Sequence, residues 1–116
     1  MIGVNTVNIS GNVTGKIFFS TTAVKKTKAC SFTLVSERKG PNGVSVYAYV
    51  KVNAYGDNLF DICNKHLNKG VYVYVQGELM NRSGKVGELT EVRANQIIFN
   101  SNVESTTADE FAETTK

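Results

Sequence analysis

Cysteine and histidine are scarce in this chain of 116 residues. Cys30 and Cys63 stand far apart in the sequence without a Cys-x-x-Cys pair, and His66 is the only histidine. These residues are too few and too scattered for a zinc cluster or a disulfide framework. Cys30 falls in a strand-like run and Cys63 in a helix-like one, so we expect two buried, reduced thiols without a function. We expect no metal and no cofactor.

Long apolar runs are also absent, and no stretch approaches the roughly 18 residues needed to cross a bilayer. The N-terminus has neither a basic segment followed by an apolar stretch nor a signal cleavage site. We therefore expect a cytoplasmic protein with no membrane partner. With only one proline, 41% hydrophobic residues and 20% charged residues, the composition is typical of one globular domain.

Charge is distributed unevenly along the chain. Residues 1–99 carry 12 lysines and arginines against 6 acidic residues, whereas residues 100–116 carry 1 lysine against 4 acidic residues. The net charge is therefore +6 for the body and −3 for the tail. A basic body indicates a polyanionic partner. Because large apolar residues nearly cease after Phe99, we predict a folded domain over residues 1–100 and a flexible acidic tail over residues 101–116.

Alternation of apolar and polar residues predicts strands over most of the chain. The run 44–55 places its valines and alanines on one apolar face and three tyrosines, a lysine and an asparagine on the other. A second run places Cys30, Phe32 and Leu34 together on an inward face, and Gly77 offers a bulge in another. The predicted strands are residues 4–13, 29–37, 44–55, 71–79 and 89–99.

One helix is predicted between the third and fourth strands. It begins at Gly56-Asp57, carries apolar residues and His66 at helical spacing, and stops at Lys69-Gly70. Turns are expected at residues 40–43 and 81–85. Five strands with one short helix between the third and fourth predict an all-β OB-fold Greek-key barrel.

Several short segments gain significance from their order and spacing. They are Gly3 to Val13, Phe32-Thr33-Leu34, Val52 to Asp57, Leu67-Asn68-Lys69-Gly70, Val73 to Leu79 and Glu91-Val92-Arg93-Ala94. In this order they resemble the bacterial and phage single-stranded DNA-binding proteins over residues 3–99. The resemblance implies an OB fold that binds and protects single-stranded DNA without sequence preference during DNA replication, recombination or repair. It also implies a homotetramer, with a dimer as the alternative.

The same resemblance assigns a binding face. The positions that match the family's stacking residues are Tyr49 and Tyr55, Lys51 lies between them, and Tyr47 shares their side of the strand. A protein that accepts any sequence needs flat π surfaces for bases and cations for phosphates, and this face supplies both. Because tyrosine has a high β propensity, ordinary strand tyrosines are the alternative.

Further basic residues are assigned to phosphate contacts. Arg82 and Lys69 fall where the family has basic residues, near the loop between strands four and five and at the helix end. Two basic clusters flank strand two, namely Lys25, Lys26 and Lys28 before it and Arg38 with Lys39 at its end. Both lie in loops that project from an OB barrel beside its binding face. For both clusters the alternative is a solvated charge run.

An oligomer interface is assigned to Tyr72, Tyr74 and Gln76, because the family counterpart of their strand lies between subunits. A second stacking surface is the alternative. The chain departs from the family where Lys16-Ile17-Phe18-Phe19 replaces an Asp-Pro-Glu turn, so we expect a loop there. It also lacks an aromatic in residues 81–88, where many members carry a tryptophan.

The end of the chain departs from the family as well. Cellular members close an acidic tip with proline and phenylalanine that recruits replication partners, and residues 109–116 lack this ending. The difference favours a phage or plasmid protein, which for a phage would act in the host cytoplasm, and leaves replication or recombination partners open.

Two other functions stay open from the sequence. An RNA-binding OB module would prefer ribose through its 2′-hydroxyl, and a protein-interaction module would show weak salt dependence of any strand binding. We do not expect an enzyme, because the sequence offers no Ser-His-Asp set, no metal cluster and no Gly-rich phosphate loop.

Overall fold

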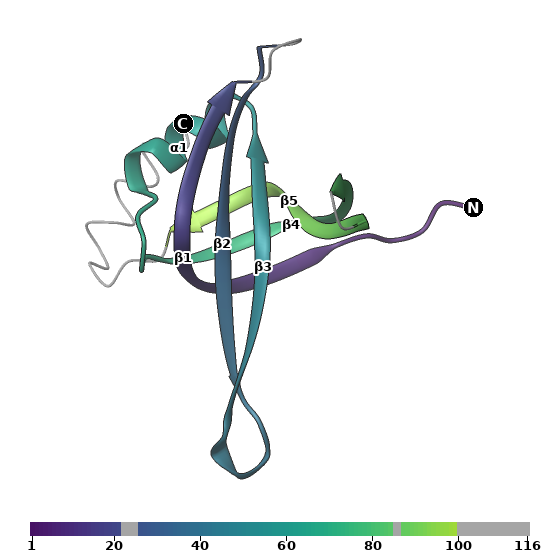
Figure 1. The fold of residues 1–116 in the computed structure, drawn as a ribbon, viewed down its shortest axis with the longest axis vertical. Helices are drawn as coiled ribbons and strands as arrows, with labels where there is room; N and C mark the ends of the chain where they lie inside the picture. The colour runs from purple at the N-terminus through teal and green to yellow at the C-terminus, as the bar shows by residue number, and fades with distance from the viewer. Residues whose placement is uncertain (22–25, 85–86, 100–116) are drawn as a thin grey trace.

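The structure is a computed structural model, and it describes residues 1–21, 26–84 and 87–99. Its strands close into one barrel in the order β1-β2-β3-β5-β4, with β1 pairing back onto β4 (Figure 1). All neighbouring strands are antiparallel except β3 and β5, which are parallel. This confirms the all-β OB barrel with one α-helix between β3 and β4. The elements are β1 (Val7–Thr21), β2 (Lys28–Lys39), a 3-10 turn η1 (Pro41–Gly43), β3 (Ser45–Tyr55), α1 (Asp57–His66), β4 (Tyr72–Gly84) and β5 (Gly87–Phe99).

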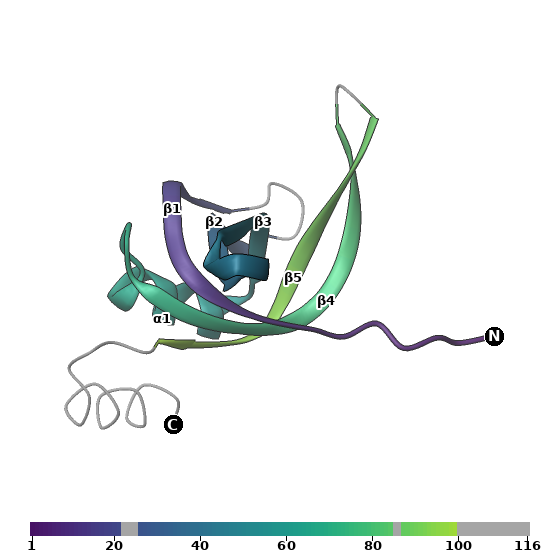
Figure 2. The same ribbon diagram turned by 90° about the horizontal axis from the view of Figure 1, so that it is seen from below.

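Strand β1 is longer than the sequence predicts. Its first half pairs with β4 and its second half with β2, so the strand curves from one side of the barrel to the other (Figures 1 and 2). A bulge between Thr14 and Phe18 permits this bend, and Gly15 supplies the positive φ of 75° there. The loop expected at residues 16–19 is therefore wrong, because pairing with β2 resumes at Phe18.

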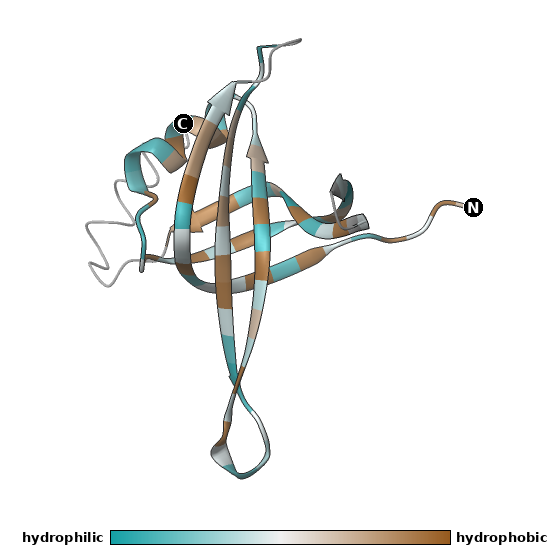
Figure 3. Ribbon diagram, viewed as in Figure 1, coloured by the Kyte–Doolittle hydropathy of each residue, from teal (hydrophilic) through white to brown (hydrophobic). Residues whose placement is uncertain are grey.

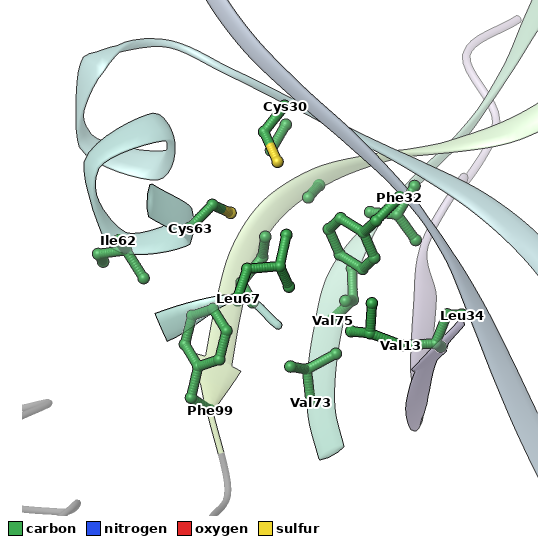
Figure 4. Close-up of a cluster of buried hydrophobic side chains, with 14 of the residues drawn as sticks. Val13, Cys30, Phe32, Leu34, Ile62, Cys63, Leu67, Val73, Val75 and Phe99 are labelled. Carbon is green, nitrogen blue, oxygen red and sulfur yellow. The ribbon is translucent and has the colours of Figure 1, made fainter. Parts of the chain in front are cut away.

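The core confirms the predicted inward residues. Cys30, Phe32 and Leu34 are at most 1% exposed, and the valines of β4 face them across the barrel (Figure 4). Along the strands of the barrel, brown apolar positions alternate with white or teal ones (Figure 3). The helix covers one end of the barrel with buried Ile62 and Cys63.

Both cysteines are free and buried, as predicted. Their sulfur atoms point toward one another from β2 and α1 (Figure 4). A hydrogen bond with Cys30 and burial raise the pKa of the Cys63 thiol, so this thiol stays protonated. The helix ends at His66, slightly before the predicted stop, and the imidazole of His66 lies 5.4 Å from the ring of Phe99, measured between centroids.

The β2–β3 hairpin extends beyond the barrel, which corrects the expected apolar face of β3. Residues 36–39 of β2 and 45–48 of β3 pair only with each other and project away from the other strands (Figure 1). Val44, Val46 and Ala48 are consequently exposed, and only the later part of that face, at Val52 and Ala54, is buried.

The β4–β5 hairpin also projects (Figure 2). The predicted bulge at Gly77 is confirmed by a register shift between Gln76 and Gly77. The predicted turn at residues 81–85 is wrong for its first part, because Asn81, Arg82 and Ser83 continue β4 opposite β5.

The predicted tail lies outside the described residues. No helix in the described ranges is long and apolar enough to cross a membrane.

Candidate functional site

Alternate residues of β3 share one outer side, which runs from the barrel onto the projecting part of the β2–β3 hairpin. We call it the tyrosine face, and it consists of Tyr47, Tyr49, Lys51 and Tyr55, with Asn53 buried between the last two. Alternation along β3 turns these side chains away from the core residues Val52 and Ala54. The most exposed are Tyr49, at 68%, and Tyr47, at 56%. The structure therefore brings together the tyrosines and the lysine that the sequence assigned to binding.

Tyr55 is held at its position by a residue that the sequence analysis did not select. The guanidinium of Arg93, on β5, lies over the Tyr55 ring at 5.3 Å from its centroid. The parallel pairing of β3 and β5 places Asn53 opposite Arg93 and so brings the two strands together here. Arg93 adds a cation to the tyrosine face. The sequence could have indicated the outward position of Arg93, because Arg93 stands between Val92 and Ala94, which are buried.

A polar network lies beneath this part of the face. Asn53, 5% exposed, donates a hydrogen bond of 2.7 Å through Nδ2 to Oε1 of Glu91, which is 3% exposed. The Ser31 hydroxyl donates to Oδ1 of Asn53 at 2.8 Å. Asn53 is therefore a buried structural residue, although the sequence placed it on a polar face. The network joins β3 to β2 and β5 at this end of the face.

Arg82 joins the same network. Its Nη2 atom lies 3.2 Å from Oε2 of Glu91, while half of its side chain is exposed. The ion pair places the guanidinium beside the tyrosine face, as the assignment to phosphate contacts requires. It also offsets part of the positive charge, because the Glu91 carboxylate is buried next to it.

The two basic residues at the end of β2 lie on opposite sides of the hairpin. Lys39 pairs with Ser45 and is on the side of the tyrosines, where its Nζ donates to the Ser45 hydroxyl at 2.9 Å. Arg38 pairs with Val46 and so belongs to the other side. Only Lys39 of this cluster therefore extends the tyrosine face.

The remaining predicted cations lie on segments other than β3, or outside the described residues. Lys28 begins β2, and its ammonium lies 5.3 Å from the centroid of the Phe60 ring on α1. Lys26 is exposed before β2, and Lys25 lies outside the described residues. Lys69 is exposed beside Gly70, whose N–H donates to the carbonyl of Val13 on β1 at 2.8 Å.

Tyr72, Tyr74 and Gln76 form a separate outer surface on β4. Tyr74 donates a hydrogen bond of 2.9 Å to Oδ1 of Asn8, and the hydroxyls of Tyr72 and Ser10 are 2.8 Å apart. Both contacts join β4 to β1, so this surface lies on a different part of the barrel from β3. Within the described ranges, no cluster of histidine, cysteine and acidic residues is arranged to hold a metal ion.

Comparisons with known proteins agree with this geometry. The family model described as the single-strand binding protein family matches residues 4–105. A solved structure described as a Plasmodium falciparum SSB complex with ssDNA is 24% identical, covers 87% of this chain and 98% of its own, and has a TM-score of 0.74. At this identity the similarity supports the barrel fold. A search of curated protein sequences gives no match.

Proposed function

Because the chain belongs to the single-strand binding protein family, we propose that it binds single-stranded DNA without sequence preference through the tyrosine face. One observation carries this proposal: Tyr49 and Tyr47 are exposed on an outer surface that also presents Lys51 and Arg93. Flat rings accept any base by stacking, and cations accept any phosphate. Paired bases offer no free faces, so duplex DNA is a poor ligand.

The proposed binding path runs along β3. Bases stack on Tyr47 and Tyr49 and against the part of the Tyr55 ring that Arg93 leaves open. Lys51, Lys39 and Arg82 supply cations for the phosphates, whereas Arg38 is on the other side of the hairpin and Lys28 lies over Phe60 of α1. Coating unpaired strands in this way protects them during replication, recombination or repair, and the protein performs no chemistry on the strand. We place it among phage or plasmid proteins of this family.

We further propose a homotetramer, with Tyr72, Tyr74 and Gln76 at a contact between subunits. Support comes from their outward position on β4, from the apolar body of each tyrosine ring, and from the separation of this surface from the tyrosine face. Light scattering at micromolar concentration tests it. A mass of four chains is expected, a mass of two chains would establish the dimer, and a monomer would contradict the proposal.

A competition titration tests the binding function. A fluorescein-labelled oligo-dT is bound, and unlabelled oligo-dT, mixed-sequence single strands, duplex DNA and RNA of equal length are then added at two salt concentrations. We expect single-stranded DNA of any sequence to compete well and duplex DNA poorly, with weaker binding at higher salt. Better competition by RNA would identify an RNA-binding protein. Absence of salt-dependent strand binding would favour a protein-interaction module instead.

A further inference from the structure

Phe18 is an exposed aromatic residue on β1 that belongs to the same outer surface as the tyrosine face. In the register of the sheet Phe18 lies opposite Ser31, and Ser31 lies opposite Asn53. Directly opposed residues point to the same side of a sheet. This side is the outer one, because the alternating neighbours Phe32 and Val52 are in the core. The Phe18 side chain is 57% exposed.

The neighbours of Phe18 have structural roles that Phe18 does not share. The ring of Phe19 packs edge-on against Phe60 of α1, with 5.3 Å between the centroids. Ile17 is partly buried against the core. Both residues lie on the inner side of β1, because alternation turns them away from Phe18. The exposed Phe18 ring is therefore not required to close the barrel.

Between Phe18 and the tyrosine face lie the small side chains of Ser31 and Ala29 on β2, and Ala29 pairs with Tyr55. Ser31 is partly exposed and Ala29 is buried, so no large side chain of β2 stands between Phe18 and β3. Adjacent strands are about 4.8 Å apart, so Phe18 on β1 lies about 10 Å across the sheet from β3. Directly opposed residues form rows that cross the three strands. The row of Phe18, Ser31 and Asn53 lies between the row that contains Lys51 and the row that contains Tyr55.

We propose that Phe18 is a stacking platform for a base, and that it carries the path of the bound strand from β3 across β2 to β1. This inference rests on the proposed function and adds a contact outside β3. The surroundings fit a polyanionic strand, because Lys51 lies in the adjacent row and exposed Lys16 lies two residues before Phe18. A phenylalanine ring has no hydroxyl to share with water, so covering it with a base also removes apolar surface from solvent.

The test compares Phe18→Ala, Phe18→Leu and Phe18→Tyr with the wild type in binding fluorescein-labelled oligo-dT. A length series from about 4 to about 16 nucleotides covers the range of an OB-fold site. We expect alanine and leucine to weaken binding of the longer strands about 5- to 150-fold, since a stacked base contributes that much. Tyrosine should restore binding, because its ring is equally flat. The shortest strands should bind all variants alike.

An abasic deoxyribose-phosphate strand of equal length provides a control for stacking. Phe18→Ala should leave its affinity unchanged, because no base is present to stack. Tyr49→Ala in the same assay reports on the proposed function. If Tyr49→Ala weakens binding while all Phe18 variants bind as the wild type does, the Phe18 platform is refuted and the function stands. If the wild type binds no strand, both proposals fail.

Two further outcomes would overturn the platform alone. Full binding by Phe18→Leu beside weak binding by Phe18→Ala would show that Phe18 contributes apolar packing without stacking. A lower mass of Phe18→Ala in light scattering would show that the ring contacts a second copy of the chain. Circular dichroism and urea unfolding of each variant ensure that a folded protein is compared.

Discussion

The guanidinium of Arg93 lies over the ring of Tyr55, 5.3 Å from its centroid. This contact joins β5 to β3 at the point where the two strands run parallel. It also covers part of the Tyr55 ring, whereas Tyr49 is 68% exposed. The two tyrosines that the family resemblance paired therefore differ, because Tyr55 contributes to the fold as well as to the face. Substitution of Tyr49 therefore tests stacking without also removing a contact between strands.

Tyr49→Ala should weaken binding to oligo-dT by about 1–3 kcal/mol, the usual contribution of one stacked base. The loss should be the same at low and high salt, since a ring contact releases few counterions. Fluorescence anisotropy across a salt series measures both quantities. Stability should change little, because the side chain is mostly exposed. A folded variant with unchanged affinity would show that the binding face lies elsewhere.

Lys51→Gln should have a different signature in the same series. Losing one phosphate contact should flatten the plot of log affinity against log salt concentration by about 0.7. The defect should therefore shrink as salt rises. Lys65→Gln is the matched control, because Lys65 is exposed on α1, away from the tyrosine face. Equal slopes for the wild type and Lys51→Gln would remove Lys51 from the phosphate path.

Glu91→Gln should reduce stability and improve binding. The glutamine oxygen can still accept from Asn53, but a charge-assisted hydrogen bond becomes a neutral one, so the free energy of unfolding should fall by about 1 kcal/mol. Arg82 loses its ionic partner and becomes available to a phosphate, so affinity should rise most at low salt. Urea unfolding and anisotropy measure the two effects.

Arg82→Gln is the counterpart of that substitution. It leaves the Glu91 carboxylate buried without its cation, and we therefore expect a larger loss of stability than in Glu91→Gln, together with weaker binding. Stronger binding by Arg82→Gln, or weaker binding by Glu91→Gln, would show that the ion pair has no part in strand binding.

Gly77→Ala should destabilise the barrel. An added Cβ would lie 2.1 Å from the backbone carbonyl oxygen of Arg93, so β4 and β5 would have to separate. Overpacking of this kind costs about 1–3 kcal/mol, measured as the free energy of urea unfolding. Gly3→Ala serves as the control, since nothing lies within 4 Å of its added Cβ. Equal stability of the two variants would contradict the close approach of the strands.

The sequence by itself determined the number and order of the strands, the helix and much of the core. Alternation of side chains is a local property of a strand, so Cys30, Phe32 and Leu34 could be placed inward without knowing their neighbours. The same alternation placed Tyr47, Tyr49 and Lys51 on one side of β3. The bulge at Gly77 was also predictable, because an isolated glycine in a strand marks a close backbone approach.

Only the tertiary structure decided which of those faces are covered. Val44 and Val46 alternate like core residues, but their part of the hairpin extends past the barrel, and among the described strands only β2 pairs with it. Asn53 and Glu91 alternate like surface residues, but they are buried because β3 and β5 meet there, although these strands are far apart in the sequence. Burial and the Arg93–Tyr55 contact depend on which strands become neighbours, and that depends on closure of the whole barrel.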